Sequence, residues 1–109
     1  MERFVKGDVV VLPFPFTDLS SSKKRPALVL IADESDDIVL CQITSKTNDK
    51  SSVFLRTEDL ANGQLPVNSF IRTTKLFTAD KVLISYKVGS LKKSKLNEAI
   101  SKLTNILKN

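Results

Sequence analysis

Hydrophobic and polar residues along this chain follow one another in short blocks, and these blocks predict a β-rich domain that ends in a helix. Residues 7–14, 25–33 and 37–45 are rich in aliphatic and β-branched side chains, which is typical of strands. All three blocks are apolar on both faces rather than alternating. A strand that is covered on both sides fits a small barrel with something packed outside it, either the helix or a second subunit.

The remaining blocks complete the predicted sheet. Residues 33–36 (DESD) have the turn chemistry of a hairpin between the second and third strands. Residues 51–57, 67–78 and 81–89 are predicted as further strands, and residues 58–66 as a polar connection rich in turn residues. The fold class that follows is α+β, a small β-barrel with a C-terminal helix.

The end of the chain, residues 90–109, has helical spacing. Its apolar residues recur at intervals of three and four positions, which places them in one stripe along a helix. Lysines in the first turn oppose the helix dipole, so they are either tolerated there or serve an anionic partner. The predicted helix is therefore amphipathic, and its stripe consists of Leu96, Ala99, Ile100, Leu103 and Leu107.

The composition fits one compact domain, residues 1–109, in which 41% of the residues are hydrophobic and 27% are charged. The longest apolar runs, VVVLPFPF and ALVLIA, fall far short of the ~20 residues that span a bilayer. No N-terminal segment has the charged, apolar and small-residue order of a signal peptide. We therefore expect a cytoplasmic protein without a membrane partner.

The cysteine and histidine counts exclude several kinds of site. The chain has one cysteine, Cys41, and no histidine. These counts exclude an internal disulfide, zinc sites built from Cys and His, and a Cys nucleophile with a His base. Cys41 lies within an apolar block, where we expect a small buried side chain. No metal and no cofactor is predicted.

The basic balance of the sequence favours an anionic partner. The formal net charge is +5, and the cations gather in residues 23–25, at Lys46 with Lys50, and in residues 92–95. Acidic residues gather too, in ADESDD. Nucleic acid is the commonest partner of a basic surface, although many solvated surfaces carry similar charge.

The predicted hairpin brings two polar side chains to one rim of the barrel. Arg25 lies where a polar loop enters an apolar strand, and Thr44 lies near the end of the next strand. If these strands pair antiparallel through their short turn, the start of one lies beside the end of the other. Gln42 lies on the same face as Thr44. Arg25 either extends its charge to solvent from a strand end or presents a rigidly held cation to an anionic substrate.

The connection before this strand begins at Phe14, closes on Lys23 and Lys24, and is longer than a hairpin needs. Long loops in compact domains are commonly functional or mobile. Lysines beside Phe14 and Phe16 suit single-stranded nucleic acid, because bases stack on aromatic rings while phosphates pair with cations. The alternative is that the two phenylalanines anchor the loop to the core. Asp18 places a carboxylate in the same loop.

The order of these motifs resembles the PemK/MazF family, the toxin halves of bacterial type II toxin–antitoxin pairs. The resemblance is carried by GDVVVLPFPFTDLSSSKKRPALVL, CQITS, GQLPVNSFIRTTKLFT and the amphipathic helix, in order over essentially the whole chain. Each motif is weak alone, but their order and spacing are specific. The resemblance implies an SH3-like barrel, a homodimer and metal-free, sequence-specific cleavage of single-stranded RNA. It also implies inhibition by an acidic, partly disordered antitoxin.

The resemblance further implies roles for individual residues. The family's catalytic arginine falls on Arg25 of KKRPALVL, and its catalytic threonine falls on Thr44 of CQITS. A second functional arginine falls on Arg72 of FIRTT, and Thr74 occupies a position where many relatives carry an aspartate. The residues predicted to contact RNA are Phe14, Phe16, Lys23, Lys24, Gln42, Ser45 and Ser69.

Metal-free RNA cleavage uses the ribose 2′-hydroxyl as the nucleophile on the adjacent phosphate. The planar fork of Arg25 suits the phosphate oxygens, and Thr44 can donate a second hydrogen bond. One such donor is typically worth on the order of 10²–10³ in rate. Asp18 and Arg72 are predicted as further catalytic or RNA-positioning residues. Asp18 is the nearest candidate base by sequence and equally a turn former, so the base is unassigned.

Two other functions stay open at this point. One is a non-catalytic binding module of the same fold, which the threonine at position 74 favours because a carboxylate is missing there. The other is a toxin of this fold that acts on a protein such as DNA gyrase rather than on RNA.

Overall fold

The computed structural model describes residues 3–14 and 23–109. The described residues form strands, two short 3-10 helices and one terminal α-helix. In chain order these are β1 (Asp8–Phe14), β2 (Lys23–Ala32), β3 (Asp37–Thr44), β4 (Ser52–Leu55), η1 (Thr57–Asp59), β5 (Leu60–Gly63), β6 (Ser69–Asp80), η2 (Lys81–Leu83), β7 (Tyr86–Leu91) and α1 (Lys93–Lys108).

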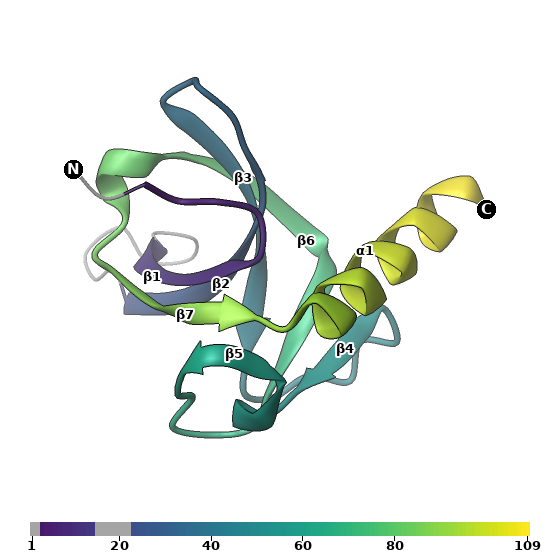
Figure 1. Ribbon diagram of the computed structural model, residues 1–109. Helices are drawn as coiled ribbons and strands as arrows, with labels where there is room; N and C mark the ends of the chain where they lie inside the picture. Colours follow the sequence, from purple (N-terminus) through teal and green to yellow (C-terminus); the bar gives the residue numbers. More distant parts are fainter. Residues whose placement is uncertain (1–2, 15–22) are drawn as a thin grey trace.

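The strands form one curled antiparallel sheet with the order β4-β6-β3-β2-β1-β7-β5. Figure 1 shows the sheet wrapping around as a half-barrel, with β4 and β5 at its two edges. β2 and β3 pair as the predicted hairpin, and β3 pairs on its other side with the long strand β6. The predicted α+β barrel with one C-terminal helix is confirmed, in the form of a half-barrel.

Both faces of the central strands are buried, as their doubly apolar sequences predict. Alternate residues of β1, β2 and β3 enter two separate hydrophobic clusters on opposite faces of the sheet. The cluster beneath α1 includes Val9, Leu28, Cys41, Ile43 and Ile71. The cluster on the other face includes Val10, Leu12, Phe14, Ala27 and Leu40.

The helix α1 covers the first cluster with its N-terminal half. Ala99 is buried in this cluster, and Leu96 and Leu103 pack against it, whereas Leu107 is 72% exposed. Figure 1 shows the C-terminal end of α1 projecting away from the sheet. The predicted apolar stripe is therefore confirmed along the first turns, and its last member is exposed.

Two segments differ from the sequence prediction. Residues 58–66, predicted as a connection without a strand, contain β5, which pairs with β7. Residues 81–89, predicted as a strand throughout, begin as η2 and become a strand only at Tyr86. The close approach of β5 to β7 explains the first difference, because a Cβ at Gly63 would collide with the Val88 carbonyl oxygen. Backbone pairing at a glycine forms this strand without an apolar pattern.

The Gly-Asp pair at the start of β1 fixes how β1 meets β7. Gly7 has a φ of 98°, which glycine adopts without strain. The Asp8 side chain is fully buried, and its carboxylate accepts hydrogen bonds from Ser90 Oγ at 2.8 Å and from the Val5 amide at 2.9 Å. Lys87 Nζ lies 3.3 Å from the same carboxylate. The buried carboxylate of Asp8 is thus paired with two hydrogen-bond donors and one ammonium group, which offsets the cost of burying its charge.

Candidate nucleic-acid interface

The start of β2 and the end of β3 meet at one rim of the half-barrel, as the hairpin predicts. Ala27 pairs with Gln42, and continuing this antiparallel register toward the rim places Arg25 opposite Thr44. Both residues line one hollow of about 740 Å³. Four further residues from the predicted site line the same hollow, namely Lys23, Lys24, Ser45 and Ser69.

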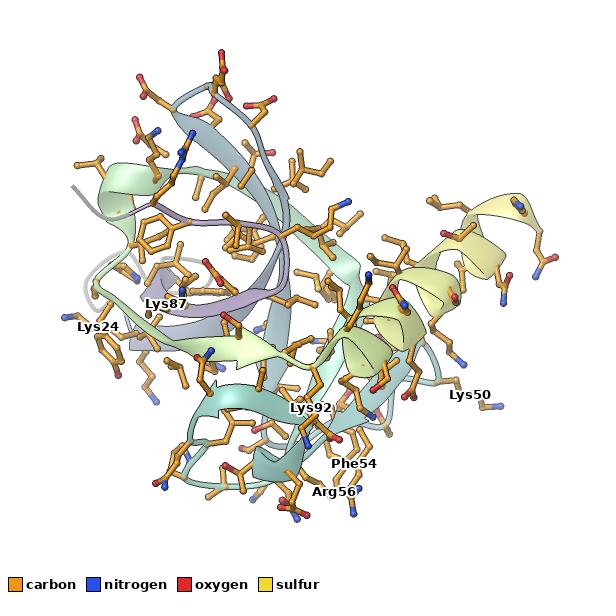
Figure 2. The ribbon with its side chains drawn as sticks, in the orientation of Figure 1. Lys24, Lys50, Phe54, Arg56, Lys87 and Lys92 are labelled. Atoms are coloured by element: carbon orange, nitrogen blue, oxygen red, sulfur yellow. The ribbon has the colours of Figure 1, made fainter. Side chains whose placement is uncertain are left out.

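The side chains around this hollow give it a positive charge. None of its described lining residues is acidic, and the cations among them are Lys23, Lys24, Arg25 and Lys87, the last of which is paired with Asp8. Figure 2 labels Lys24 and Lys87, which both line this hollow. Tyr86 also lines the hollow and is 54% exposed, which adds an aromatic surface beside the cations. We call this site the cationic hollow.

Two hydrogen bonds orient the Thr44 hydroxyl. Its Oγ1 donates to the Lys46 carbonyl oxygen at 3.1 Å and accepts from the Lys46 amide at 3.4 Å. A hydroxyl has one proton to donate. Donation from Thr44 to a phosphate oxygen therefore requires the hydrogen bond to the Lys46 carbonyl to open, while the amide contact can remain.

Gln42 and Arg72 lie in a neighbouring hollow of about 400 Å³. Arg72 Nη1 donates to Gln42 Oε1 at 3.2 Å, and Arg72 Nη2 lies 3.5 Å from Asp49 Oδ2. Thr44 follows Gln42 by two positions along β3, so the two share a face and lie about 7 Å apart. The predicted site is therefore divided between two hollows that β3 connects.

Asp49 is a residue of this site that the sequence analysis missed. It lies between β3 and β4, and its carboxylate accepts hydrogen bonds from Ser51 Oγ at 2.7 Å and from the Ser51 amide at 2.9 Å. These hydrogen bonds, together with the Arg72 guanidinium, hold the pKa of the Asp49 carboxyl below its usual range. Asp49 is consequently ionised at neutral pH. The pairing of β6 with both β3 and β4 brings this loop to Arg72, and no local pattern indicates it.

Two residues predicted to contact RNA are buried. Phe14 is 5% exposed, and its ring meets the ring of Phe77 edge-on, with centroids 4.9 Å apart. Ser69 is also buried, and its hydroxyl donates to the Val67 carbonyl oxygen at 3.2 Å. For Phe14 this geometry favours the alternative of a core anchor. The predictions for Phe16 and Asp18 lie outside the described residues.

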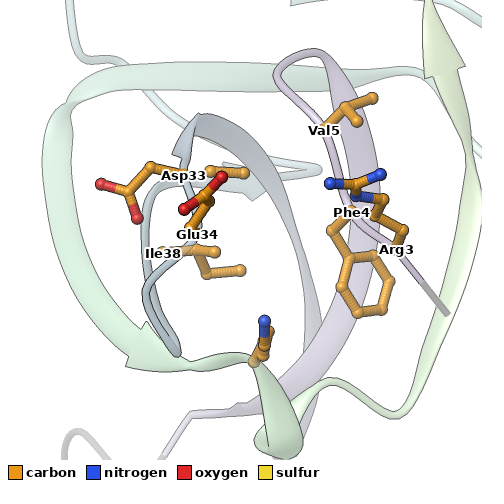
Figure 3. A pocket seen from close by; sticks show the side chains of 8 residues that line it. Arg3, Phe4, Val5, Asp33, Glu34 and Ile38 are labelled. Carbon is orange, nitrogen blue, oxygen red and sulfur yellow. The ribbon is translucent and has the colours of Figure 1, made fainter. Parts of the chain in front are cut away.

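A third hollow, of about 780 Å³, lies at the opposite end of β2. Figure 3 shows Asp33 and Glu34 on one side of it and Arg3 on the other. Lys81 also lines it, so two acids offset two bases. At about 3.3 Å per residue, β2 separates this hollow from Arg25 by roughly 20 Å. We call it the mixed-charge hollow, and it offers a phosphate no net attraction.

Three further findings concern the chemistry of the described residues. Within residues 3–14 and 23–109, no three His, Cys, Asp or Glu side chains are grouped so that they could hold a metal ion. Cys41 is a free, buried cysteine, as predicted, and burial raises the pKa of its thiol to about 12. None of the described helices is long and apolar enough to cross a membrane.

Fold and site together define a small antiparallel half-barrel protein with one terminal helix and a basic rim. Residues 5–107 match the family model of PemK-like, MazF-like toxins of type II toxin–antitoxin systems. The chain belongs to this family, which confirms the resemblance seen in its motifs.

Solved structures share the fold over nearly the whole chain. A MazE–MazF complex from Deinococcus radiodurans is similar with a TM-score of 0.78 and 21% identity over 98% of each chain. An endoribonuclease in complex with its cognate antitoxin, from a mycobacterial species, gives 0.75 and 17%, covering 99% of this chain and 96% of that one. The toxin MazF-mt6 of Mycobacterium tuberculosis gives 0.70 and 14%, covering 93% and 96%. A sequence comparison with curated proteins found no match.

Proposed function

We propose that this toxin cleaves single-stranded RNA by attack of a ribose 2′-hydroxyl on its own phosphate, and that the cationic hollow holds that phosphate. The observation that carries the proposal is the meeting of Arg25 and Thr44 at a hollow that Lys23 and Lys24 also line and that has no acid among its described lining residues. Family membership supports it, as does the likeness in fold to proteins described as endoribonucleases.

This reaction depends on stabilising the negative charge of the phosphate in the transition state more than on a strong nucleophile. The 2′-hydroxyl loses its proton as its oxygen bonds to phosphorus. The bond from phosphorus to the 5′-oxygen breaks and that oxygen takes up a proton, which leaves a 2′,3′-cyclic phosphate and a 5′-hydroxyl. Negative charge builds on the non-bridging oxygens between these events. The Arg25 fork binds two such oxygens and keeps its charge throughout. Thr44 donates a further hydrogen bond once it leaves the Lys46 carbonyl.

The proposal includes two kinds of protein partner, an antitoxin and a second copy of this chain. An acidic antitoxin segment placed across the cationic hollow would compete with the RNA backbone, and the antitoxin complexes of two similar structures support such a partner. Its affinity should fall as salt rises, because screening weakens exposed charge pairs. A second copy of this chain is the other partner, so we expect a homodimer. The molar mass from light scattering at micromolar protein concentration tests this.

The function is tested by incubating a long single-stranded RNA with the protein in EDTA, with Arg25→Ala purified in parallel. Primer extension maps the cuts, and end analysis identifies the cyclic phosphate. Discrete cuts made only by the wild type support the proposal and reveal the recognised sequence. Intact RNA with both proteins would instead favour the binding module, and inhibition of purified gyrase would favour the toxin that acts on a protein.

A further inference from the structure

We propose that Asp49 is a positioning residue of this site, which holds the Arg72 guanidinium in place for the bound RNA in the hollow next to the cationic one. The inference rests on the ribonuclease function proposed above. It assigns to a loop between two strands the carboxylate that this chain lacks at position 74.

The first step is the contact between the two charged groups. Arg72 is held from two sides, since one terminal nitrogen donates to Gln42 and the other lies 3.5 Å from Asp49. The Arg72 and Asp49 side chains are only 25% and 24% exposed, so water screens this pair less than it screens a pair on the open surface. The guanidinium therefore has one preferred orientation, on the face of β3 that also carries Thr44.

The second step is that Asp49 is itself held by a chain of hydroxyl groups. The Ser51 hydroxyl donates to Asp49 Oδ1 at 2.7 Å, and Ser51 Oγ lies 3.0 Å from Thr74 Oγ1. Because the single proton of Ser51 goes to the carboxylate, Thr74 must be the donor to Ser51. Thr73 Oγ1 donates to the Ser51 carbonyl oxygen at 2.8 Å, which fixes the loop on β6. The loop is thus built around Asp49.

The third step links this geometry to position 74. Thr74 lies two hydrogen bonds away from the Asp49 carboxylate, on the same strand as Arg72. A carboxylate at position 74 would lie on the same side of Arg72 as Asp49 does now. The network consequently supplies a negative group next to the arginine from a different part of the chain.

The role predicts that binding and cleavage move in opposite directions when the charge is removed. Asp49→Asn takes away a negative charge beside Arg72, so RNA should bind at least as tightly as it does to the wild type. The guanidinium is then no longer held, and a displaced catalytic-site group costs up to about 10²-fold in rate. A merely structural role for Asp49 would lower both properties along with stability.

The test measures kcat and the Kd for a non-cleavable RNA, together with Tm, for Asp49→Asn and for the matched control Asp36→Asn. Asp36 is an exposed acid in the turn before β3, paired with Lys81 at 3.9 Å. We expect kcat to fall at least tenfold in Asp49→Asn with Kd unchanged or lower, and no change in the control. The double variant D49N/T74D should recover part of the lost kcat.

Each other outcome overturns the inference. Unchanged or faster cleavage by Asp49→Asn would mean that Asp49 is idle or competes with phosphate for Arg72. Weaker binding in parallel with a lower Tm, without recovery in the double variant, would mean that Asp49 only holds the loop. If Asp49→Asn fails to fold, Ser51→Ala replaces it, with the same expected split between kcat and Kd. Wild-type protein that leaves RNA intact would overturn the proposed function and this inference together.

Discussion

The two ends of β2 carry hollows of similar size and different charge. At the start of the strand the cationic hollow, about 740 Å³, is lined by four basic side chains and no acidic one among its described residues. At the end of the strand the mixed-charge hollow, about 780 Å³, is lined by two acids and two bases. Size therefore does not distinguish a site for an anionic polymer in this molecule. The net charge and the presence of a fixed hydroxyl are what differ between the two hollows.

The largest expected effect is the loss of RNA cleavage when Arg25 is removed from the cationic hollow. Arg25→Ala should lower the rate of RNA cleavage on the order of 10²–10³-fold, the usual worth of one group that stabilises charge in the transition state. Lys81→Ala, the matched loss of a cation from the mixed-charge hollow, should leave the rate within a factor of two or so of the wild type. Single-turnover cleavage of one RNA by the three proteins measures both effects. Equal losses in the two variants would contradict the distinction.

The next effect concerns the stability of the fold where β1 meets β7. Asp8→Ala leaves the Ser90 hydroxyl and the Lys87 ammonium without their buried partner, which should cost about 2–3 kcal/mol of unfolding free energy. Urea unfolding measures it, and Asp37→Ala, an exposed acid at the start of β3, is the control. A cost below about 0.5 kcal/mol, the range of ordinary surface changes, would show that Asp8 does not anchor β1 to β7.

A smaller effect separates the hollows by their salt dependence. Lys24→Ala should reduce the slope of log K against log salt by about 0.7 for single-stranded RNA, the contribution of one phosphate contact. Lys81→Ala should leave the slope unchanged. Fluorescence titrations of a labelled, non-cleavable RNA at several salt concentrations give both slopes. A change of the same size in both variants would place phosphate at both ends of β2.

The smallest effect compares two similar aspartates. Hydrogen bonds from Ser51 lower the pKa of Asp49, and hydrogen bonds from Ser35 lower the pKa of Asp33 beside the mixed-charge hollow. A carboxyl whose pKa is lowered by folding adds stability above its unfolded pKa of about 4, and this stability is lost as the pH falls through the lower folded value.

Ser51→Ala and Ser35→Ala should each raise the pKa of the neighbouring aspartate, as followed by carboxyl carbon NMR between pH 2 and 6. Only Ser51→Ala should slow RNA cleavage at neutral pH. A slower reaction in Ser35→Ala would show that the turn at the mixed-charge hollow also serves the site.

The sequence predicts the hairpin side of the molecule well. The doubly apolar blocks correctly indicate strands buried on both faces, and a turn of four residues between two of them is enough to bring Arg25 and Thr44 to one rim. Local patterns carry this information because both residues lie on neighbouring strands. The helix is predicted from its spacing alone.

The remaining features depend on contacts between distant parts of the chain. Asp49 meets Arg72 because β3 and β4 both pair with β6, and a glycine lets β5 lie against β7. Lys87 reaches the cationic hollow from a segment that reads as an ordinary strand. The position of Phe14 at the start of a basic loop suggests an exposed ring that stacks on bases, yet the ring is buried against Phe77. Burial of this kind is decided by packing and not by residue type.

The most direct measurement is an NMR titration of the 15N-labelled protein with a short single-stranded RNA carrying 2′-O-methyl groups, which removes the nucleophile and prevents cleavage. We predict that the largest amide shifts fall in residues 23–25 and 44–45, and that residues 32–34 at the mixed-charge hollow stay unchanged. Shifts centred on residues 32–38, or no shifts at either end of β2, would contradict the assignment of the cationic hollow as the RNA site.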